Sequence, residues 1–245
     1  MKLNKLMFRE YDIRGIWNED ITEEVSYYIG RAYATKLLSL KKNKMIVGYD
    51  NRLSSPIIEK NLVKGLTDGG VDVVRLGLVT TPMYYYAWDK LNIHCGIMIT
   101  ASHNPKEYNG FKMSYNGIHN CFGNEVAELY YIILNGIYSK GNGSITDANI
   151  KEDYIKMINS HINMGSNKLK VIYDCGNGTT SIVAKDIFVS NNNIEYIPLF
   201  AESDGTFPNH HPDPAVESNL TILKEKVKEL NADCGIAFDG DGDRV

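Results

Sequence analysis

The sequence predicts an α/β protein of two similar three-layer domains, each with a mixed, mostly parallel sheet, facing a shared cleft. Two observations carry this prediction. Short runs of β-forming residues alternate with amphipathic helical segments along the chain, which is typical of sheets covered by helices. Two of these runs, at Gly96-Ile97 and Gly235-Ile236, begin alike and each lead into a polar loop. A length of 245 residues allows one large domain or two ordinary ones.

Composition and charge exclude several classes of protein. The chain is 43% hydrophobic and 23% charged, an ordinary globular balance. A formal net charge of −4 argues against a nucleic-acid-binding surface, which would be basic. The four scattered cysteines form no Cys-x-x-Cys pair, which fits buried thiols in a reducing cytoplasm. No apolar run approaches the ~20 residues of a membrane span, and the N-terminus lacks a signal-peptide core. We therefore expect a cytoplasmic protein without a nucleic-acid or membrane partner.

The first domain is predicted from alternating helices and strands. Helices are expected over residues 22–40, from 56 to 69, from 81 and over 125–139; strands are expected over 45–50, 71–76, 93–100 and 111–113. Thr22 is a suitable N-cap for the first helix, and Ser55 can cap the second, with Pro56 at its first position. Glycines and serines over 139–144 break the pattern, so we place domain 1 at 1–143 and domain 2 at 144–245.

The second domain repeats this alternation. Helices are expected over residues 151–163, over 181–189 and from 218; strands are expected over 169–174, 194–200 and 235–238. Gly176 and Gly178 lie between a strand and a helix and predict a close backbone approach near the domain interface. His210 and His211 have no second cluster to complete a zinc site, so loop packing or the cleft edge is expected for them.

The loop after residues 93–100 contains candidate catalytic residues. Ligands of open α/β sheets bind beyond the carboxyl ends of strands, which is where Ser102 and His103 lie. A serine hydroxyl needs activation to act as a nucleophile. The alternative for Ser102 is a turn residue that binds its own backbone. Lys112, on the following strand, can carry a proton if a pocket lowers its pKa, or it is a solvated lysine.

The loop after residues 235–238 is rich in carboxylates. Asp239, Asp241 and Asp243 alternate with glycines and precede Arg244. This spacing directs three hard oxygen ligands at one point, as Mg²⁺ or Ca²⁺ requires, whereas three unpaired carboxylates would repel one another. An EF-hand loop would need a glutamate at its twelfth position, beyond Val245. A haloacid-dehalogenase-like phosphatase would carry its Asp-x-Asp motif on its first strand.

Residues 100–105 and 239–244 together resemble the α-D-phosphohexomutase superfamily. Residues 8–15 and 204–214 are similar to two signatures of its phosphomannomutase/phosphoglucomutase branch. The resemblance covers the whole chain. The family normally has four domains, and this chain resembles domain 1 and most of domain 2, with domains 3 and 4 absent.

The resemblance implies phosphoryl transfer that interconverts hexose 1-phosphate and hexose 6-phosphate through a phosphoserine and a bisphosphorylated sugar. Hexose phosphates would be the substrates, and hexose 1,6-bisphosphate the activator and intermediate. The implied residues are Ser102 as the phosphoserine, Tyr11 and Arg14 in the cleft, and Asp239, Asp241 and Asp243 with the phosphoserine as ligands of Mg²⁺. His103 and Lys112 are then candidates for acid/base work, and Arg244 for stabilising the transferring group.

Three alternatives stay open on the sequence. By resemblance, sugar recognition belongs to domain 3 and the grip on the non-transferring phosphate to domain 4, so mannose and glucose are not distinguished. A phosphoglucosamine mutase is an alternative within the family. A non-catalytic metal- and phosphate-binding fragment, or half of a split mutase that needs a chain supplying domains 3 and 4, is an alternative of another class. We expect the chain alone to be incomplete for turnover.

Overall fold

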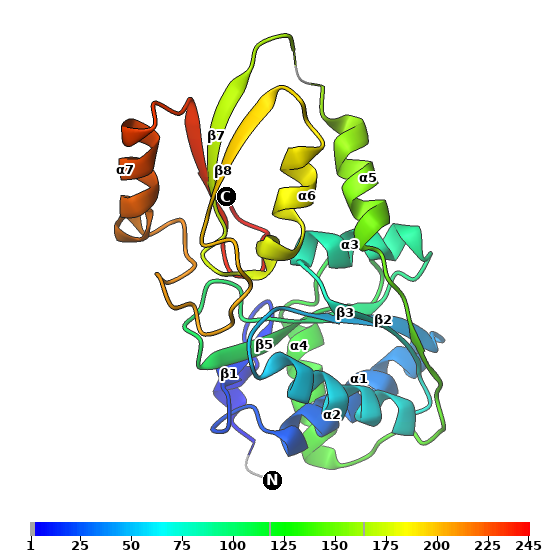
Figure 1. Cartoon of the computed structure of the whole chain (residues 1–245). Coiled ribbons are helices and arrows are strands. Elements are labelled where there is room, and N and C mark those ends of the chain that lie inside the picture. Colours follow the sequence, from blue (N-terminus) through cyan, green and yellow to red (C-terminus); the bar gives the residue numbers. More distant parts are fainter. Residues whose placement is uncertain (1–2, 118, 164) are drawn as a thin grey trace.

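The chain folds into two α/β domains, seen one above the other in Figure 1. The computed structural model describes residues 3–117, 119–163 and 165–245. One domain contains a six-stranded mixed sheet and the other a three-stranded parallel sheet, both with flanking helices. The predicted fold class is therefore confirmed. Within the described residues, no helix combines the length and apolar character needed to cross a bilayer.

The first sheet brings the ends of its parallel strands to one edge. Its strands are β1 (Ile13–Ile16), β2 (Lys44–Tyr49), β3 (Asp72–Leu78), β4 (Gly96–Ile99), β5 (Tyr108–Ser114) and β6 (Ile145–Asp147), in the order β1-β5-β4-β2-β3-β6. Strands β4, β2, β3 and β6 are parallel, while β1 and β5 are antiparallel to their neighbours. The antiparallel return of β5 pairs Lys112 with Met98 on β4, so the lysine lies close to the loop that follows β4.

Helices cover both faces of this sheet (Figure 1). Helices α1 (Glu23–Ser39), α2 (Ser55–Asp68) and α4 (Asn124–Asn135) pack on one face, and α3 (Thr81–Lys90) and α5 (Lys151–His161) on the other. Thr22 caps α1 as predicted, since its hydroxyl accepts from the Val25 amide at 3.2 Å. The predicted cap of α2 is wrong. Ser55 is the first helical residue, and its hydroxyl instead donates to Asp50 at 2.6 Å.

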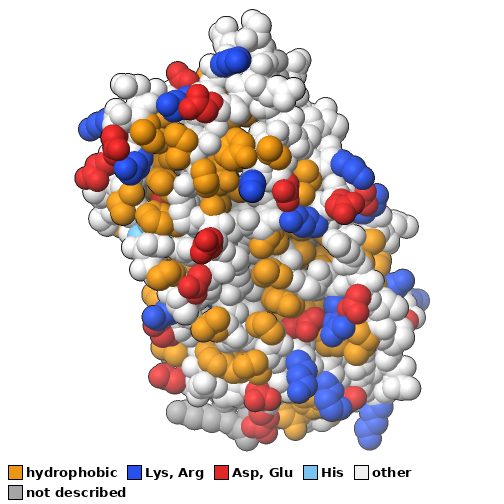
Figure 2. All heavy atoms as spheres, in the orientation of Figure 1, with side chains coloured by type: hydrophobic (Ala, Val, Ile, Leu, Met, Phe, Trp, Pro, Cys, Tyr) orange, Lys and Arg blue, Asp and Glu red, His pale blue; other side chains and the backbone are white. Residues whose placement is uncertain are grey.

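The second domain has a smaller sheet that is less completely covered. Its parallel strands are β7 (Leu169–Asp174), β8 (Ile194–Leu199) and β9 (Cys234–Ala237), in the order β8-β7-β9. Helices α6 (Ala184–Val189) and α7 (Thr221–Glu229) pack on its two faces. The predicted helix over 181–189 is divided into a 3₁₀ turn (Thr179–Ile182) and α6; two further 3₁₀ turns are Lys5–Met7 and Glu217–Leu220. Figure 2 shows hydrophobic side chains at the surface between α7 and α6.

The two domains are joined by continuous packing. Strand β6 pairs in parallel with β3, so residues 145–147 extend the first sheet, beyond residue 144 where we expected domain 2 to begin. The boundary itself stays a prediction. Val183 of the second domain shares a buried cluster with Val74 of the first sheet. The predicted close approach at Gly178 is confirmed, because an added Cβ there would lie 2.9 Å from the Gly240 carbonyl oxygen. The loop after β9 in turn lies against the loop after β4, because a Cβ added to Gly240 would lie 2.6 Å from the Ser102 carbonyl oxygen.

Candidate active site

Ser102 occupies a tight, buried turn after β4. Its φ of 52° is in the left-handed region, which is uncommon for a residue other than glycine. The amide of Ser102 donates to the Thr100 hydroxyl at 2.8 Å, and the amide of Asn104 donates to the Ala101 carbonyl at 3.0 Å. Only 1% of Ser102 is exposed. The turn therefore holds the hydroxyl in one direction instead of leaving it in solvent.

The Ser102 hydroxyl meets the carboxylate-rich loop of the other domain. Its Oγ donates to Asp239 Oδ2 at 2.8 Å. The second oxygen of Asp239 accepts from the backbone amides of Gly242, Asp243 and Arg244 at 3.0–3.1 Å. One carboxylate thus organises its own loop and reaches the serine. The structure brings together two motifs that lie 137 residues apart.

Asp241 is the most enclosed of the three carboxylates. It is fully buried, and its Oδ2 accepts hydrogen bonds from the hydroxyls of Thr81 at 2.7 Å and Thr100 at 3.1 Å. Lys112 donates to the same oxygen at 2.8 Å and also forms an ion pair with Asp243. Ligand oxygens of the three aspartates lie within 4.8 Å of one another. Asp241 of the second domain is therefore contacted by three side chains of the first domain, and Lys112 is the charged one.

The protonation of the cluster follows from burial and mutual repulsion. Burial, together with the charges of Asp241 and Asp243, raises the pKa of Asp239 to about 7. Burial also opposes the charge on Asp241, but the charge of Lys112 and the hydrogen bonds from Lys112 and Thr81 together outweigh burial and lower the pKa of that carboxyl. Burial disfavours the ammonium of Lys112, yet Asp241 and Asp243 outweigh this and raise its pKa. The suggestion that a pocket lowers the pKa of Lys112 is therefore wrong, because two carboxylates face it.

The cluster has the properties of a divalent-cation site. Asp241 Oδ1 is buried and has no hydrogen-bond partner among the described residues. An unpartnered carboxylate oxygen in such a place is costly unless a cation or a donor meets it. Burial, and after it the charges of Asp241 and Asp243, raise the pKa of Asp239, so a further negative charge is disfavoured at this place. Because Mg²⁺ prefers hard oxygen ligands, the donor set fits this ion.

The imidazole of His103 also lies close to the serine hydroxyl. Its Nδ1 is 3.2 Å from Ser102 Oγ. Burial, with the positive charge of Arg244, lowers the pKa of His103 below its ordinary value. The imidazole is therefore mostly neutral near pH 7 and offers a nitrogen that can accept or return a proton. This geometry is compatible with the predicted acid/base role, which stays a prediction.

A cavity of about 620 Å³ opens beside these groups. Its lining residues are Tyr11, Asp12, Arg14, Lys112, Asn120, Phe122 and Arg244. Arg14 donates to Asp12 and to Asn104 of the serine turn, while 70% of Tyr11 is exposed. Four residues that the sequence singled out therefore line one cavity, and three of them carry positive charge. This arrangement favours an anionic ligand.

The chain matches two family models. They are "Phosphoglucomutase/phosphomannomutase, alpha/beta/alpha domain I" over residues 5–136 and "alpha/beta/alpha domain II" of the same family over residues 152–245. The chain belongs to the phosphoglucomutase/phosphomannomutase family. The resemblance that the sequence motifs indicated is confirmed. The two matched units contribute the serine turn and the aspartate loop, respectively.

Relatives within the phosphoglucomutase/phosphomannomutase family extend well beyond the matched region. A phosphomannomutase/phosphoglucomutase of Pseudomonas syringae pv. tomato is 46% identical over 240 residues, covering 98% of this chain and 51% of that protein. A phosphoglucomutase of Neisseria meningitidis serogroup B is 40% identical over 241 residues, with coverage of 98% and 52%. A family member from Burkholderia thailandensis, solved by crystallography, gives a TM-score of 0.92 at 35% identity, with coverage of 98% and 54%. The chain spans about half the length of the curated relatives it matches.

Some residues of this phosphoglucomutase/phosphomannomutase-family site were not predicted from the sequence. Asn120 and Phe122 reach the cavity from the segment after β5, which carries no recognisable motif. Thr81 contacts Asp241 through both its hydroxyl, at 2.7 Å, and its amide, which donates to the Asp241 carbonyl at 2.9 Å. Thr81 was visible only as the start of a helix before Pro82. Its partner lies 160 residues away, so no local pattern could indicate the contact.

Proposed function

We propose that the chain forms the phosphoryl-transfer half of a phosphohexomutase, which interconverts hexose 1-phosphate and hexose 6-phosphate. Ser102 carries the transferring phosphoryl group. One observation supports this above all others. The Ser102 hydroxyl of the first domain lies 2.8 Å from Asp239, within a cluster of three carboxylates supplied by the second domain. A serine that only stabilised its own turn would not need such a partner.

The transfer exchanges one oxygen–phosphorus bond for another. A sugar hydroxyl attacks the phosphorus of phosphoserine, a new sugar O–P bond forms, and the bond from Ser102 Oγ to phosphorus breaks. The attacking sugar hydroxyl gives its proton to a base, and that base returns one proton to Ser102 Oγ, so no proton is gained or lost overall. His103 is the candidate to handle that proton, since its Nδ1 lies 3.2 Å from Oγ and its pKa is lowered. A second transfer, in the reverse sense, returns the other phosphate of the bisphosphate to the serine.

Charge stabilisation accounts for the remaining groups. Mg²⁺, when bound by Asp239, Asp241, Asp243 and the phosphoserine, would neutralise the charge that develops on the transferring group. Lys112 is held charged by its carboxylate partners, so its proposed contribution is electrostatic. Arg14 and Arg244 line the cavity and can bind phosphate oxygens. Hexose phosphates are the proposed ligands of this cavity.

Intact mass spectrometry tests the role of Ser102. The chain is incubated with glucose 1,6-bisphosphate and Mg²⁺, and the gain of one phosphate is measured. We expect this gain in the wild type and in Ser39→Ala, a variant of an exposed serine, and none in Ser102→Ala. Phosphate at another residue, or its persistence in Ser102→Ala, would contradict the assignment.

We also propose that mutase turnover needs residues beyond those of this chain. The chain covers about half of the relatives, and remote substrate contacts commonly supply the binding energy that orients reacting groups. A coupled assay with glucose 1-phosphate or mannose 1-phosphate, primed with the bisphosphate, should show negligible turnover by the chain alone. Addition of a chain that supplies the remaining half should restore it. Turnover typical of metabolic enzymes without that addition would overturn this proposal.

A further inference from the structure

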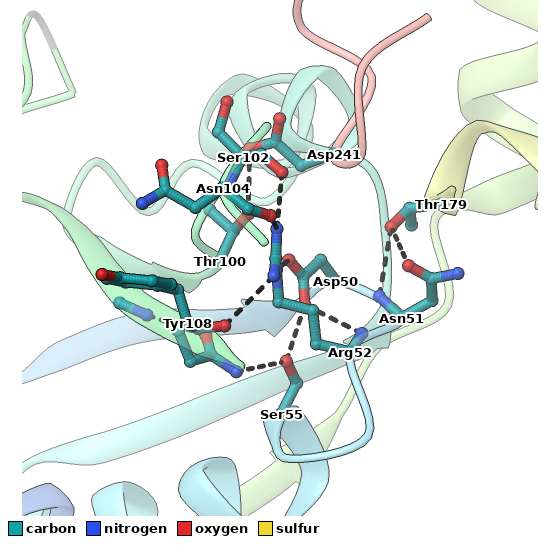
Figure 3. Close-up of polar contacts among 12 residues, drawn as sticks. Asp50, Asn51, Arg52, Ser55, Thr100, Ser102, Asn104, Tyr108, Thr179 and Asp241 are labelled. Atoms are coloured by element: carbon teal, nitrogen blue, oxygen red, sulfur yellow. Dashed lines mark hydrogen bonds and ion pairs between the residues drawn. The ribbon is translucent and has the colours of Figure 1, made fainter. Parts of the chain in front are cut away.

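Arg52 lies at the centre of the turn that carries Ser102 (Figure 3). Its guanidinium is fully buried and reaches from the loop after β2 toward Ser102 and Asn104. Nη2 donates to the carbonyls of Ser102 at 2.8 Å and Asn104 at 2.7 Å, and Nη1 donates to those of Pro105 at 2.6 Å and Tyr108 at 3.1 Å. All five of its N–H groups are used, because Nε forms an ion pair with Asp50 at 3.1 Å.

These bonds act on a strained residue. Ser102 has a φ of 52°, a conformation that persists in a residue with a Cβ only when its surroundings hold it there. Thr100 fixes the amide on one side of Ser102, and Arg52 fixes the carbonyl on the other. The direction of the hydroxyl toward Asp239 follows from this conformation. Without Arg52, the carbonyl of Ser102 would have no side-chain donor among its recorded contacts.

The same carbonyl is also the surface on which the aspartate loop rests. A Cβ added to Gly240 would lie 2.6 Å from the Ser102 carbonyl oxygen, so the two loops are in direct backbone contact. Arg52 therefore holds the atom that sets how closely Asp239 and Asp241 approach the serine. A rotated Ser102 peptide would displace the carboxylates as well as the hydroxyl.

The second domain closes over Arg52. A Cβ added to Gly205 would lie 2.2 Å from the Asn51 carbonyl oxygen and 2.9 Å from Arg52 Cα. The ring of Phe207 covers the guanidinium, with its centroid 5.4 Å from the central carbon. Asn51 donates from its side-chain amide to the Asn177 carbonyl at 2.7 Å. The loop that carries Arg52 is thus bound on one side by the serine turn and on the other by domain 2.

We propose that Arg52 is a positioning residue for phosphoryl transfer at Ser102. It holds the serine turn in the one conformation that directs Oγ at the aspartate cluster and presents the carbonyl on which the aspartate loop packs. The proposal rests on the proposed function, since the reaction it serves is transfer to and from Ser102. Lysine cannot replace it, because an ammonium has three donors at one point and cannot span four carbonyls and a carboxylate.

Arg52→Lys tests the proposal, with Arg75→Lys as the matched control. Arg75 is partly exposed and pairs with Asp147 on β6, so the same exchange there leaves the serine turn untouched. Phosphate uptake from saturating glucose 1,6-bisphosphate with Mg²⁺ is followed by intact mass. We expect the rate constant in Arg52→Lys to fall by about tenfold or more. The final phosphorylated fraction and the half-saturating bisphosphate concentration should be unchanged, whereas partial unfolding would lower the fraction. Arg75→Lys should match the wild type.

Hydrogen exchange supplies the second measurement. In folded Arg52→Lys, the amides of Ser102 and Asn104 should exchange about tenfold faster or more, while those of β2 keep their protection. An unchanged rate constant, or unchanged exchange in this turn, would overturn the proposal. If the variant does not fold, the wild type decides: these two amides should exchange as slowly as those of β4, and exchange at the rate of an open loop would refute the role. A wild type that takes up no phosphate would refute the proposed function but not the role of Arg52, because hydrogen exchange tests independently whether Arg52 holds the serine turn.

Discussion

The serine turn and the aspartate loop follow strands that both contain a Gly-Ile pair, yet they are stabilised in different ways. The serine turn is held from outside, by the guanidinium of Arg52 and the hydroxyl of Thr100. The aspartate loop is held through its own carboxylates, because one oxygen of Asp239 accepts three amides of the loop and Asp241 accepts from Thr81, Thr100 and Lys112. The serine turn contains a residue with an unfavourable backbone φ, whereas the aspartate loop brings together three carboxylates that repel one another.

This difference predicts different sensitivities. The backbone carbonyls of the serine turn are paired with donors of Arg52, so the stability of this turn should be sensitive to substitutions that change the packing around it. The aspartate loop places three carboxylates together, and Lys112 is the cation in direct contact with two of them. It should therefore respond to changes of charge.

Loss of the ammonium should have the largest effect on stability. Lys112→Met leaves the fully buried Asp241 without its ion-pair partner, and breaking a buried pair costs about 3 kcal/mol or more. Urea unfolding without divalent cations measures this change. The control is Lys64→Met, whose pair with Asp68 is exposed and screened by water, so its loss should have little effect. Similar losses in both variants would show that the aspartate loop does not depend on this charge.

A change of shape at the contact between the loops should cost less. In Gly240→Ala, the added Cβ would lie 2.6 Å from the Ser102 carbonyl oxygen, which belongs to a backbone fixed by Arg52. Overpacking against a rigid partner costs about 2 kcal/mol, measured by thermal or urea unfolding. At Gly165 an added Cβ meets no described atom within 4 Å, so Gly165→Ala serves as the control and should be near neutral. A neutral Gly240→Ala would mean that the serine turn yields more easily than we infer.

A divalent cation should stabilise the protein by neutralising the carboxylates of the aspartate loop. Mg²⁺ at about ten times its dissociation constant should raise the free energy of unfolding of the wild type by about 1.4 kcal/mol. Asp241→Asn should lose most of this gain, while Asp89→Asn, which alters a largely exposed carboxylate, should retain it. Calorimetric titration should also show tighter Mg²⁺ binding once Ser102 is phosphorylated. Equal affinity in wild type, Asp241→Asn and phosphorylated chain would place the cation elsewhere.

The smallest expected effect on stability is that of His210 in domain 2, and it depends on pH. His210 Nε2 lies 2.9 Å from Asp174 Oδ2 at the end of β7, and this hydrogen bond raises the pKa of His210. Its stabilisation is therefore complete below the unfolded pKa of about 6.5 and is lost as pH rises through the higher folded pKa.

Urea unfolding of His210→Gln at two pH values measures that effect. The variant should lose about 1 kcal/mol at about pH 6 and less at about pH 9, because only the protonated imidazole forms an ion pair with the carboxylate. Asp174→Asn should remove the pH dependence of the difference. A loss that grows with pH would show that the neutral imidazole is the form that stabilises the loop.

The pattern of local residues was enough to predict most elements and both reactive loops. Runs of β-forming residues and the glycines, prolines and polar residues that end them identified the strands that lead into Ser102 and Asp239, since these signals lie within a few neighbouring residues. The same reasoning misplaced the cap of α2, because the Ser55 hydroxyl is taken by Asp50 across a tight turn. It passed over β6, whose three exposed residues become a strand only by pairing with β3.

The sequence by itself therefore determined the α/β class, the two polar loops and the chemistry that their side chains offer, because each depends on short-range spacing. Only the tertiary structure decided how those groups behave. Lys112 stays charged although it is buried, because it meets a carboxylate 129 residues away. Ser102 is held because Arg52, 50 residues earlier in the chain, directs four of its five donors at the carbonyls of residues 102–108. Burial and charge act through space, so the raised pKa of Asp239 exists only once the two sheets are packed together, and the strain at Ser102 only once the loops after β2 and β4 meet.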